Sequence, residues 1–191
     1  MMILASQSPR RRELLALISP EFRVIPAQGE EFLPENITPE DAVLLLSRQK
    51  AEEISSRIYP GCDTVPETII AADTVVAIDG EILGKPRSRE QAAQMLRKLS
   101  GREHSVYTGV TVISGAQSVS FAEKTVVEFF PLTEEEIAGY IATGEPMDKA
   151  GAYGIQGRGA LLVKRIDGDY YNVMGLPVGE LHQRLKSMGV C

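Results

Sequence analysis

Cysteine and histidine are scarce in this chain of 191 residues. The two cysteines, Cys62 and Cys191, form no Cys-x-x-Cys pair, so we expect free thiols and neither a zinc site nor a disulfide framework. The two histidines, His104 and His182, show no spacing typical of zinc ligands, and a Ser-His-Asp triad would have to use one of them. We interpret both histidines as structural residues.

An excess of positive charge is also missing, because the formal net charge is -6 at pH 7. Binding to nucleic acid without sequence preference needs a basic surface, so the composition argues against that class. No apolar run approaches the ~20 residues that cross a bilayer. The N-terminus lacks the pattern of a signal peptide. We therefore expect a cytoplasmic protein with neither a membrane nor direct nucleic acid as a partner.

The remaining composition is that of a globular protein, with 43% hydrophobic and 24% charged residues. We expect one domain over residues 1–191, with room for two lobes. Hairpin signals lie among helices that open with capping residues, which predicts an α/β fold with a mixed sheet flanked by helices. The pattern predicts strands at 2–5, 22–27, 68–78, 81–83, 105–113, 118–130, 160–166 and 170–174, and helices at 9–18, 39–57, 89–99, 133–143 and from 177 onward.

The first helix begins in a way that favours anion binding. Ser8 is a good N-cap, Pro9 suits the first helical position, and the free N–H groups of such a helix start attract anions. Arg10, Arg11 and Arg12 nevertheless stand at this positive end, and a bound anion would resolve the conflict.

A helical wheel separates these arginines. An apolar face defined by Leu14, Leu17 and Ile18 includes Arg10 and Arg11 but leaves Arg12 outside. Two inward guanidinium groups predict a phosphate as their partner, since its oxygens match their bidentate donors. The alternative is a solvated basic turn that pairs with nearby acids.

Asp73 interrupts an apolar run, because Ile69–Ala72 precede it and Thr74–Ala77 follow it. A carboxylate in a buried strand is costly unless it is paired, hydrogen-bonded or bound to a metal. We interpret Asp73 as a metal ligand or a general base. The alternative is a bulge or strand end at which Asp73 reaches water.

Two lysines and two glutamates are further candidates. Lys50 falls in the apolar stripe of its helix, where it either meets a phosphate or extends to the surface along its stem. Lys85 follows the hairpin that begins with the strand of Asp73, and either returns to the same cleft or is a surface lysine. Glu30 and Glu31 either supply oxygen ligands for Mg²⁺ or Mn²⁺ or form an exposed acidic loop.

A glycine-rich loop spans residues 150–159, and its four glycines permit close approach of the backbone to a ligand. It matches neither a Walker loop nor the Gly-x-Gly-x-x-Gly pattern after a strand. Gln156 has a donor group and an acceptor with which to bind the edge of a base. The alternative is a plain flexible loop.

Several segments together resemble one family, the Maf nucleoside triphosphate pyrophosphatases, and they follow its order along nearly the whole chain. The resemblance is to the branch acting on dTTP and UTP rather than to the branch acting on 7-methyl-GTP. The matching segments are Ser6-Gln7-Ser8-Pro9-Arg10-Arg11, Ala72-Asp73-Thr74, Gly84-Lys85-Pro86, Leu99-Ser100-Gly101, residues 148–157 and Gly175-Leu176-Pro177.

The resemblance implies a two-lobed α/β fold around a mixed, twisted sheet with a central cleft, a divalent cation and a homodimer. It also implies that Asp73 is the catalytic general base. Arg11, Thr74 and Gln156 would determine which nucleobase the site accepts. Hydrolysis would then fall between the α- and β-phosphates, with Glu31 and Asp73 holding Mg²⁺ or Mn²⁺. Ser8, Arg10, Arg11, Lys50 and Lys85 would bind the triphosphate.

Two other functions stay open at this point. One is a nucleotide-binding regulator of septum formation without turnover, which the historical association of the family suggests. The other is a phosphohydrolase that releases orthophosphate from the same anion site. The products separate these hypotheses: pyrophosphate, orthophosphate or none.

Overall fold

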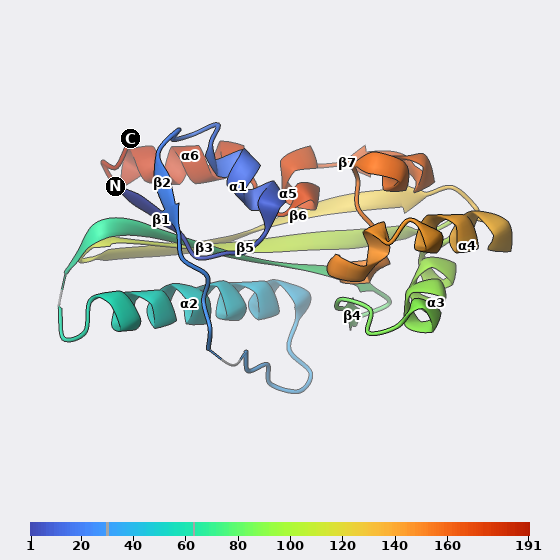
Figure 1. Ribbon diagram of the computed structural model, residues 1–191, viewed down its shortest axis with the longest axis horizontal. Coiled ribbons are helices and arrows are strands. Elements are labelled where there is room, and N and C mark those ends of the chain that lie inside the picture. The colour runs from blue at the N-terminus through green and yellow to red at the C-terminus, as the bar shows by residue number, and fades with distance from the viewer. Residues whose placement is uncertain (30, 63) are drawn as a thin grey trace.

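A seven-stranded mixed sheet runs through the whole computed structural model, which describes residues 1–29, 31–62 and 64–191 (Figure 1). The strands lie in the order β2-β1-β3-β5-β6-β7, and β4 pairs with β3 beyond the end of β1. Their bounds are Met2–Leu4 (β1), Phe22–Val24 (β2), Val65–Ile78 (β3), Glu81–Leu83 (β4), Glu103–Gly115 (β5), Gln117–Phe129 (β6) and Val163–Asp167 (β7).

The sheet is mixed because two kinds of connection build it. A short helix joins β1 to β2, and β1 pairs in parallel with both β2 and β3. Tight turns join β3 to β4 and β5 to β6, so these pairs are antiparallel, as are β3 with β5 and β6 with β7. The prediction of a mixed α/β sheet is confirmed.

Helices cover both faces of the sheet (Figure 1). At one end, α2 lies on one face, while α1, α5 and α6 lie on the other. At the opposite end, α3 and α4 pack together beside β4. Their bounds are Pro9–Leu15 (α1), Pro39–Ile58 (α2), Arg89–Leu99 (α3), Glu134–Ala142 (α4), Tyr170–Met174 (α5) and Val178–Ser187 (α6).

The hydrophobic core has two ends, which correspond to two lobes. One cluster joins α3 and α4 to the far ends of β3, β5 and β6. At the other end, α1 and α6 cover one face of the sheet, and α2 covers the opposite face. Alternation along β3 connects them, since Ile70 and Ala72 face α1 and α6 whereas Ile69 and Ala71 face α2.

Two expectations about local structure are wrong. Residues 170–174 are helical rather than a strand, because the Asp169 side chain caps the N–H of Tyr171 at 2.7 Å and Gly175 ends the helix with φ of 112°. Leu17 is 67% exposed, because α1 ends at Leu15 and the following turn leaves the helical phase.

The glycine-rich loop is also more ordered than the sequence suggested. It contains short 3₁₀ helices at Ala150–Ala152 and Gly157–Leu162, and another 3₁₀ helix, Glu145–Asp148, precedes it. The expected strand at 160–166 therefore begins only at Val163. Within the described residues, no helix combines the length and apolarity needed to cross a membrane.

Candidate active site

A cleft of about 930 Å³ lies between the two lobes. It opens at the edge of β3, because β1 pairs with β3 only as far as Ile70 and β4 begins to pair only at Val76. Among the described residues, no strand therefore pairs with residues 71–75 on this side. The cleft is lined by every candidate that the structure describes: Ser8, Arg10, Arg11, Glu31, Lys50, Asp73, Thr74, Lys85 and Gln156. Glu30 lies outside the described residues.

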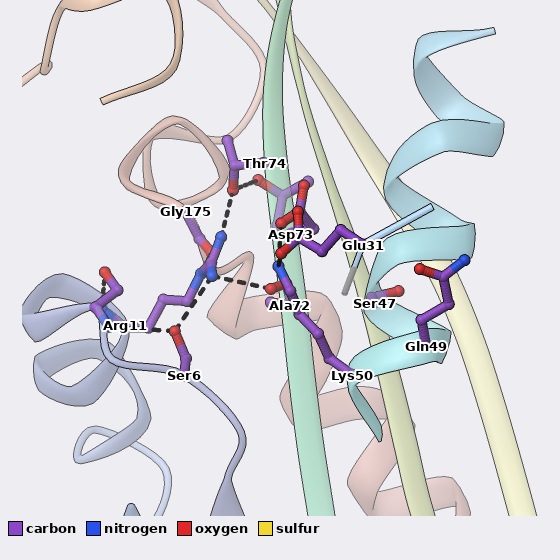
Figure 2. Close-up of polar contacts among 12 residues, drawn as sticks. Ser6, Arg11, Glu31, Ser47, Gln49, Lys50, Ala72, Asp73, Thr74 and Gly175 are labelled. Atoms are coloured by element: carbon purple, nitrogen blue, oxygen red, sulfur yellow. Dashed lines mark hydrogen bonds and ion pairs between the residues drawn. The ribbon is translucent and has the colours of Figure 1, made fainter. Parts of the chain in front are cut away.

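Two carboxylates meet one ammonium group among the residues that line the cleft (Figure 2). The Nζ atom of Lys50 lies 2.9 Å from an Oε1 atom of Glu31 and also contacts Asp73. The side chains of Lys50 and Asp73 are only 17% and 15% exposed, so Lys50 points inward and does not extend to the surface. The expected strand carboxylate and the expected helix lysine are thus direct partners.

The close packing of α2 on the sheet brings Lys50 to Asp73. Gly109 lies opposite Asp73 on β5, and a Cβ atom there would come within 2.3 Å of the carbonyl oxygen of Val43 in α2. Only glycine permits this approach. The hydroxyl groups of Ser47 and Thr111 join the same two elements at 2.9 Å.

The loop that carries Glu31 is held to α2 through Phe32, the residue that follows Glu31. The side-chain oxygen of Gln49 accepts the N–H of Phe32 at 3.2 Å, and its Nε2 donates to the Phe32 carbonyl at 3.0 Å. Gln49 directly precedes Lys50, so this two-point contact positions Glu31 beside the ammonium group.

The same two carboxylates fit a divalent cation, because both already converge on one positive charge. Mg²⁺ is usually bound by one or two carboxylates together with phosphates and water. Among the described residues, no group of three or more histidines, cysteines, aspartates or glutamates is placed to hold a metal. The site therefore suits a cation that arrives with a phosphate rather than an all-protein metal cage.

Arg11 is bound by neutral oxygens rather than by an acid. Its Nε donates to the Gly175 carbonyl at 2.7 Å, and its Nη1 donates to the Ala72 carbonyl at 2.9 Å and to Ser6 at 3.3 Å. Its Nη2 donates to Thr74 at 2.9 Å (Figure 2). Burial lowers the pKa of Arg11, and the nearby Asp73 carboxylate opposes this shift.

The wheel separated the three arginines correctly, since Arg12 is exposed while Arg10 and Arg11 are partly buried. Ser8 caps α1, as expected, by accepting the Arg11 N–H at 3.4 Å. Arg10 has an acid partner, because its Nη1 lies 3.2 Å from Asp148. Its environment thus agrees with the alternative of a basic turn paired with nearby acids.

Gln156 and Lys85 reach the cleft from the second lobe, and both are exposed. Lys85 forms no ion pair in the part of the chain that the structure describes, so its charge is available to a ligand.

The loop that carries Gln156 is fixed by contacts from α4 and the following turn. Glu145 accepts the N–H groups of Arg158 and Gly159 at 3.2 and 3.3 Å. The Tyr140 hydroxyl accepts the Gly154 N–H at 3.1 Å, and burial raises the pKa of Tyr140 to about 12. The loop is thus held in place rather than freely flexible.

Sequence reasoning missed several residues of the site. Ser6 and Gly175 were noted only within motifs, and both bind Arg11. Asp148 joins Arg10 to Lys149, whose Nζ lies 2.6 Å from the Asp148 carboxylate. The dipeptide Asp148-Lys149 ahead of the glycine-rich loop was the available signal. Nothing in the local sequence marks Glu145 as the residue that fixes the loop.

A family model described as "Maf-like protein" matches residues 1–188. The chain belongs to the Maf family. A protein of Carboxydothermus hydrogenoformans named dTTP/UTP pyrophosphatase is 53% identical over 188 residues, covering 97% of each chain. A protein of the same name from Bacillus velezensis is 50% identical over 189 residues, covering 99% of this chain and 97% of the relative.

Two solved structures support the fold of this Maf protein. The Ham1 protein of Staphylococcus aureus superposes with a TM-score of 0.54 at 16% identity and covers 98% of each chain. A HAM1 protein from Coxiella burnetii gives a TM-score of 0.53 at 14% identity, covering 97% of this chain and 98% of its own. The expected α/β fold with a mixed sheet flanked by helices is therefore confirmed.

Proposed function

We propose that this Maf protein is a nucleoside triphosphate pyrophosphatase that hydrolyses dTTP and UTP, including 5-substituted uridine triphosphates. The products are the nucleoside monophosphate and pyrophosphate. Relatives with about 50% identity over nearly the whole chain carry the name dTTP/UTP pyrophosphatase. The observation that carries the proposal is that paired carboxylates, cations and polar groups suited to a nucleobase meet in one cleft.

Triphosphate binding falls to the cations around the cleft. Phosphoryl transfer depends mainly on positioning and on neutralising charge, and less on covalent chemistry by the protein. Lys85 has no acid partner among the described residues and binds a phosphate directly. Arg10 contributes a second donor beside the α1 N-terminus, where its own backbone N–H has no partner among the described residues.

Asp73 activates the water that attacks the substrate. Its carboxylate orients that water or accepts its proton while the anhydride between the α- and β-phosphates breaks. We assign Glu31 and Asp73 to Mg²⁺ or Mn²⁺, which when bound neutralises phosphate charge and polarises water. Lys50 holds these two carboxylates together, and its ammonium group would also bind phosphate oxygens.

The base lies toward Arg11, Thr74 and Gln156. These residues offer N–H donors, a hydroxyl and an amide, which match the carbonyl and imide groups of uracil and thymine. A site that pairs such groups rejects another base because its own polar atoms would be left unpaired. A cytoplasmic location and a homodimer stay predictions of the family resemblance.

The test is a substrate panel of dTTP, UTP, CTP, GTP and 7-methyl-GTP with Mg²⁺ or Mn²⁺, with pyrophosphate and orthophosphate measured separately. We expect pyrophosphate, and the highest kcat/KM for dTTP and UTP. Orthophosphate as the primary product, a purine preference, or binding without turnover would each contradict the proposal. The last result would favour a regulatory protein.

Gln156→Ala tests the base-binding role within the same panel. It should lower kcat/KM for dTTP and UTP more than for CTP. Arg158→Ala is the matched control, because Arg158 lies on the same loop but does not line the cleft. Equal loss on all substrates in Gln156→Ala would remove Gln156 from base selection.

A further inference from the structure

A chain of hydroxyl groups leads from Arg11 away from the cleft into the core. The Thr74 hydroxyl oxygen lies 2.9 Å from that of Thr108, and the Thr108 hydroxyl lies 3.0 Å from the carbonyl oxygen of Asn172. Thr108 is fully buried and does not line the cleft. It contacts Thr74 because β3 and β5 pair these two residues directly.

The chemistry of the last contact fixes the direction of all the others. A carbonyl oxygen only accepts hydrogen bonds, so Thr108 must use its single hydroxyl proton toward Asn172. Thr108 is then left as the acceptor in its contact with Thr74, and Thr74 must donate. The Thr74 oxygen in turn accepts from the Nη2 of Arg11. The order of donation is therefore Arg11, Thr74, Thr108 and Asn172.

The Asn172 end of this series of hydrogen bonds is rigid. The Asn172 carbonyl also accepts the Gly175 N–H at 2.9 Å. The Asn172 side chain is buried and donates to the Val106 carbonyl at 3.1 Å and to Thr125 at 2.9 Å. Asn172 thus has no freedom to turn its carbonyl away and release the Thr108 proton.

This order of donation determines which hydrogen-bonding groups Thr74 and Arg11 offer to a ligand in the cleft. Because the Thr74 proton is directed to Thr108, its remaining lone pair offers a ligand only an acceptor. Arg11 has five N–H donors and uses four on Gly175, Ala72, Ser6 and Thr74, which leaves one on Nη2 within the contacts of the described residues. A donor and an acceptor therefore stand side by side.

This pair matches one kind of base edge. Uracil and thymine present a carbonyl acceptor beside an imide N–H donor. Cytosine presents an unprotonated ring nitrogen at the imide position, which would face the Thr74 lone pair without a proton between them. Resting on the proposed function, we propose that Thr108 is a positioning residue for specificity: it holds the Thr74 hydroxyl as an acceptor for the imide N–H. Gln156 is then left to bind a base carbonyl.

Thr108→Val tests this inference, because valine has nearly the same shape but no hydroxyl. The Thr74 proton is then free to turn toward the cleft and to donate to cytosine. We expect the ratio of kcat/KM for UTP to that for CTP to fall at least about fivefold. Thr108→Ser retains the hydroxyl and should restore the ratio. Thr108→Ala repeats the test if the valine variant does not fold.

Thr111→Val is the matched control. Thr111 lies on the same strand, is equally buried, and bonds to Ser47 and Ser120 away from the cleft. It should leave the ratio unchanged. A folded Thr108→Val protein with the ratio of the wild type would overturn the inference, as would failure of Thr108→Ser to restore it.

Binding of UMP and CMP separates this inference from the proposed function. Calorimetry should show that the wild type prefers UMP and that Thr108→Val loses this preference. If no triphosphate is hydrolysed but these binding results hold, the pyrophosphatase proposal fails and the role of Thr108 stands. If the wild type is active on UTP but Thr108→Val binds UMP and CMP as the wild type does, the role of Thr108 fails alone.

Discussion

Lys50 and Asp73 form an ion pair that joins α2 to the middle of β3, and Glu31 joins the pair from a loop. The pair lies at the stretch of β3 that has no neighbouring strand on one side among the described residues, and it lines the cleft. Under the proposed function, this geometry makes Asp73 the first residue to test.

Asp73→Asn should lower kcat by at least ~10²-fold, because the amide can neither accept a proton nor bind a cation as a carboxylate does. Measurement of pyrophosphate release checks this, with a thermal melt to confirm the fold. Asp79→Asn is the control, since Asp79 is exposed in the turn after β3 and pairs only with Arg102 among the described residues. Near-normal hydrolysis by folded Asp73→Asn would remove Asp73 from the mechanism.

Arg10→Ala should weaken triphosphate binding by ~1.5–3 kcal/mol, the usual value of a hydrogen bond to a charged group. Arg12→Ala should stay within about 0.5 kcal/mol, because Arg12 is exposed and does not line the cleft. KM and kcat of the two variants make the comparison. An equal effect of both would show that the two arginines do not differ as the wheel and the cleft indicate.

Gln49→Ala should raise the Mg²⁺ or Mn²⁺ concentration for half-maximal activity by about tenfold, the lower range for residues that orient a metal ligand. Its contacts with Phe32 fix the loop of Glu31, and alanine removes both. Gln94→Ala, an exposed position on α3, is the control. An unchanged metal requirement in Gln49→Ala would separate the loop contact from cation binding.

His104 should make stability depend on pH. Burial lowers the pKa of His104 to about 4, below its ordinary value of about 6.5, so the unfolded chain binds a proton that the folded protein does not. Stability is therefore complete above about pH 6.5 and falls by about 3 kcal/mol as the pH drops to about 4. Denaturant unfolding at several pH values measures this loss.

His104→Phe should flatten that slope while lowering stability at pH 7, since the Tyr153 hydroxyl loses its 2.7 Å contact with Nε2. A slope that persists in His104→Phe would assign the acid sensitivity to other groups.

The sequence predicted those parts of the site that depend on local chemistry. Ser8 and Pro9 mark the start of α1, and Asp73 stands out because apolar residues surround it. Helix periodicity placed Lys50 on the inner face, and the structure pairs it with Asp73. The register of β3 against β5, which sets Thr74 opposite Thr108, depends on residues far apart in the chain and left no local pattern.

The wrong assignment at residues 170–174 has a related cause. Tyrosine and valine favour strands. The Asp169 cap and the left-handed Gly175 instead bound a short helix. Hydrogen bonds from the Asn172 side chain to β5 and β6 stabilise this helix. Tertiary contacts outweighed the local preference. Leu17 was misplaced because periodicity alone does not show where a short helix ends.

The strands β3, β5 and β6 pass without interruption from one lobe into the other, and this limits how the cleft can change shape. Rotation of one lobe against the other would bend three hydrogen-bonded strands at once, unlike hinge motion about a single linker. Adjustment to a substrate therefore falls to exposed side chains of the cleft, such as those of Lys85 and Gln156. The floor of the cleft is built before the nucleotide arrives, so little ordering of the chain has to accompany binding.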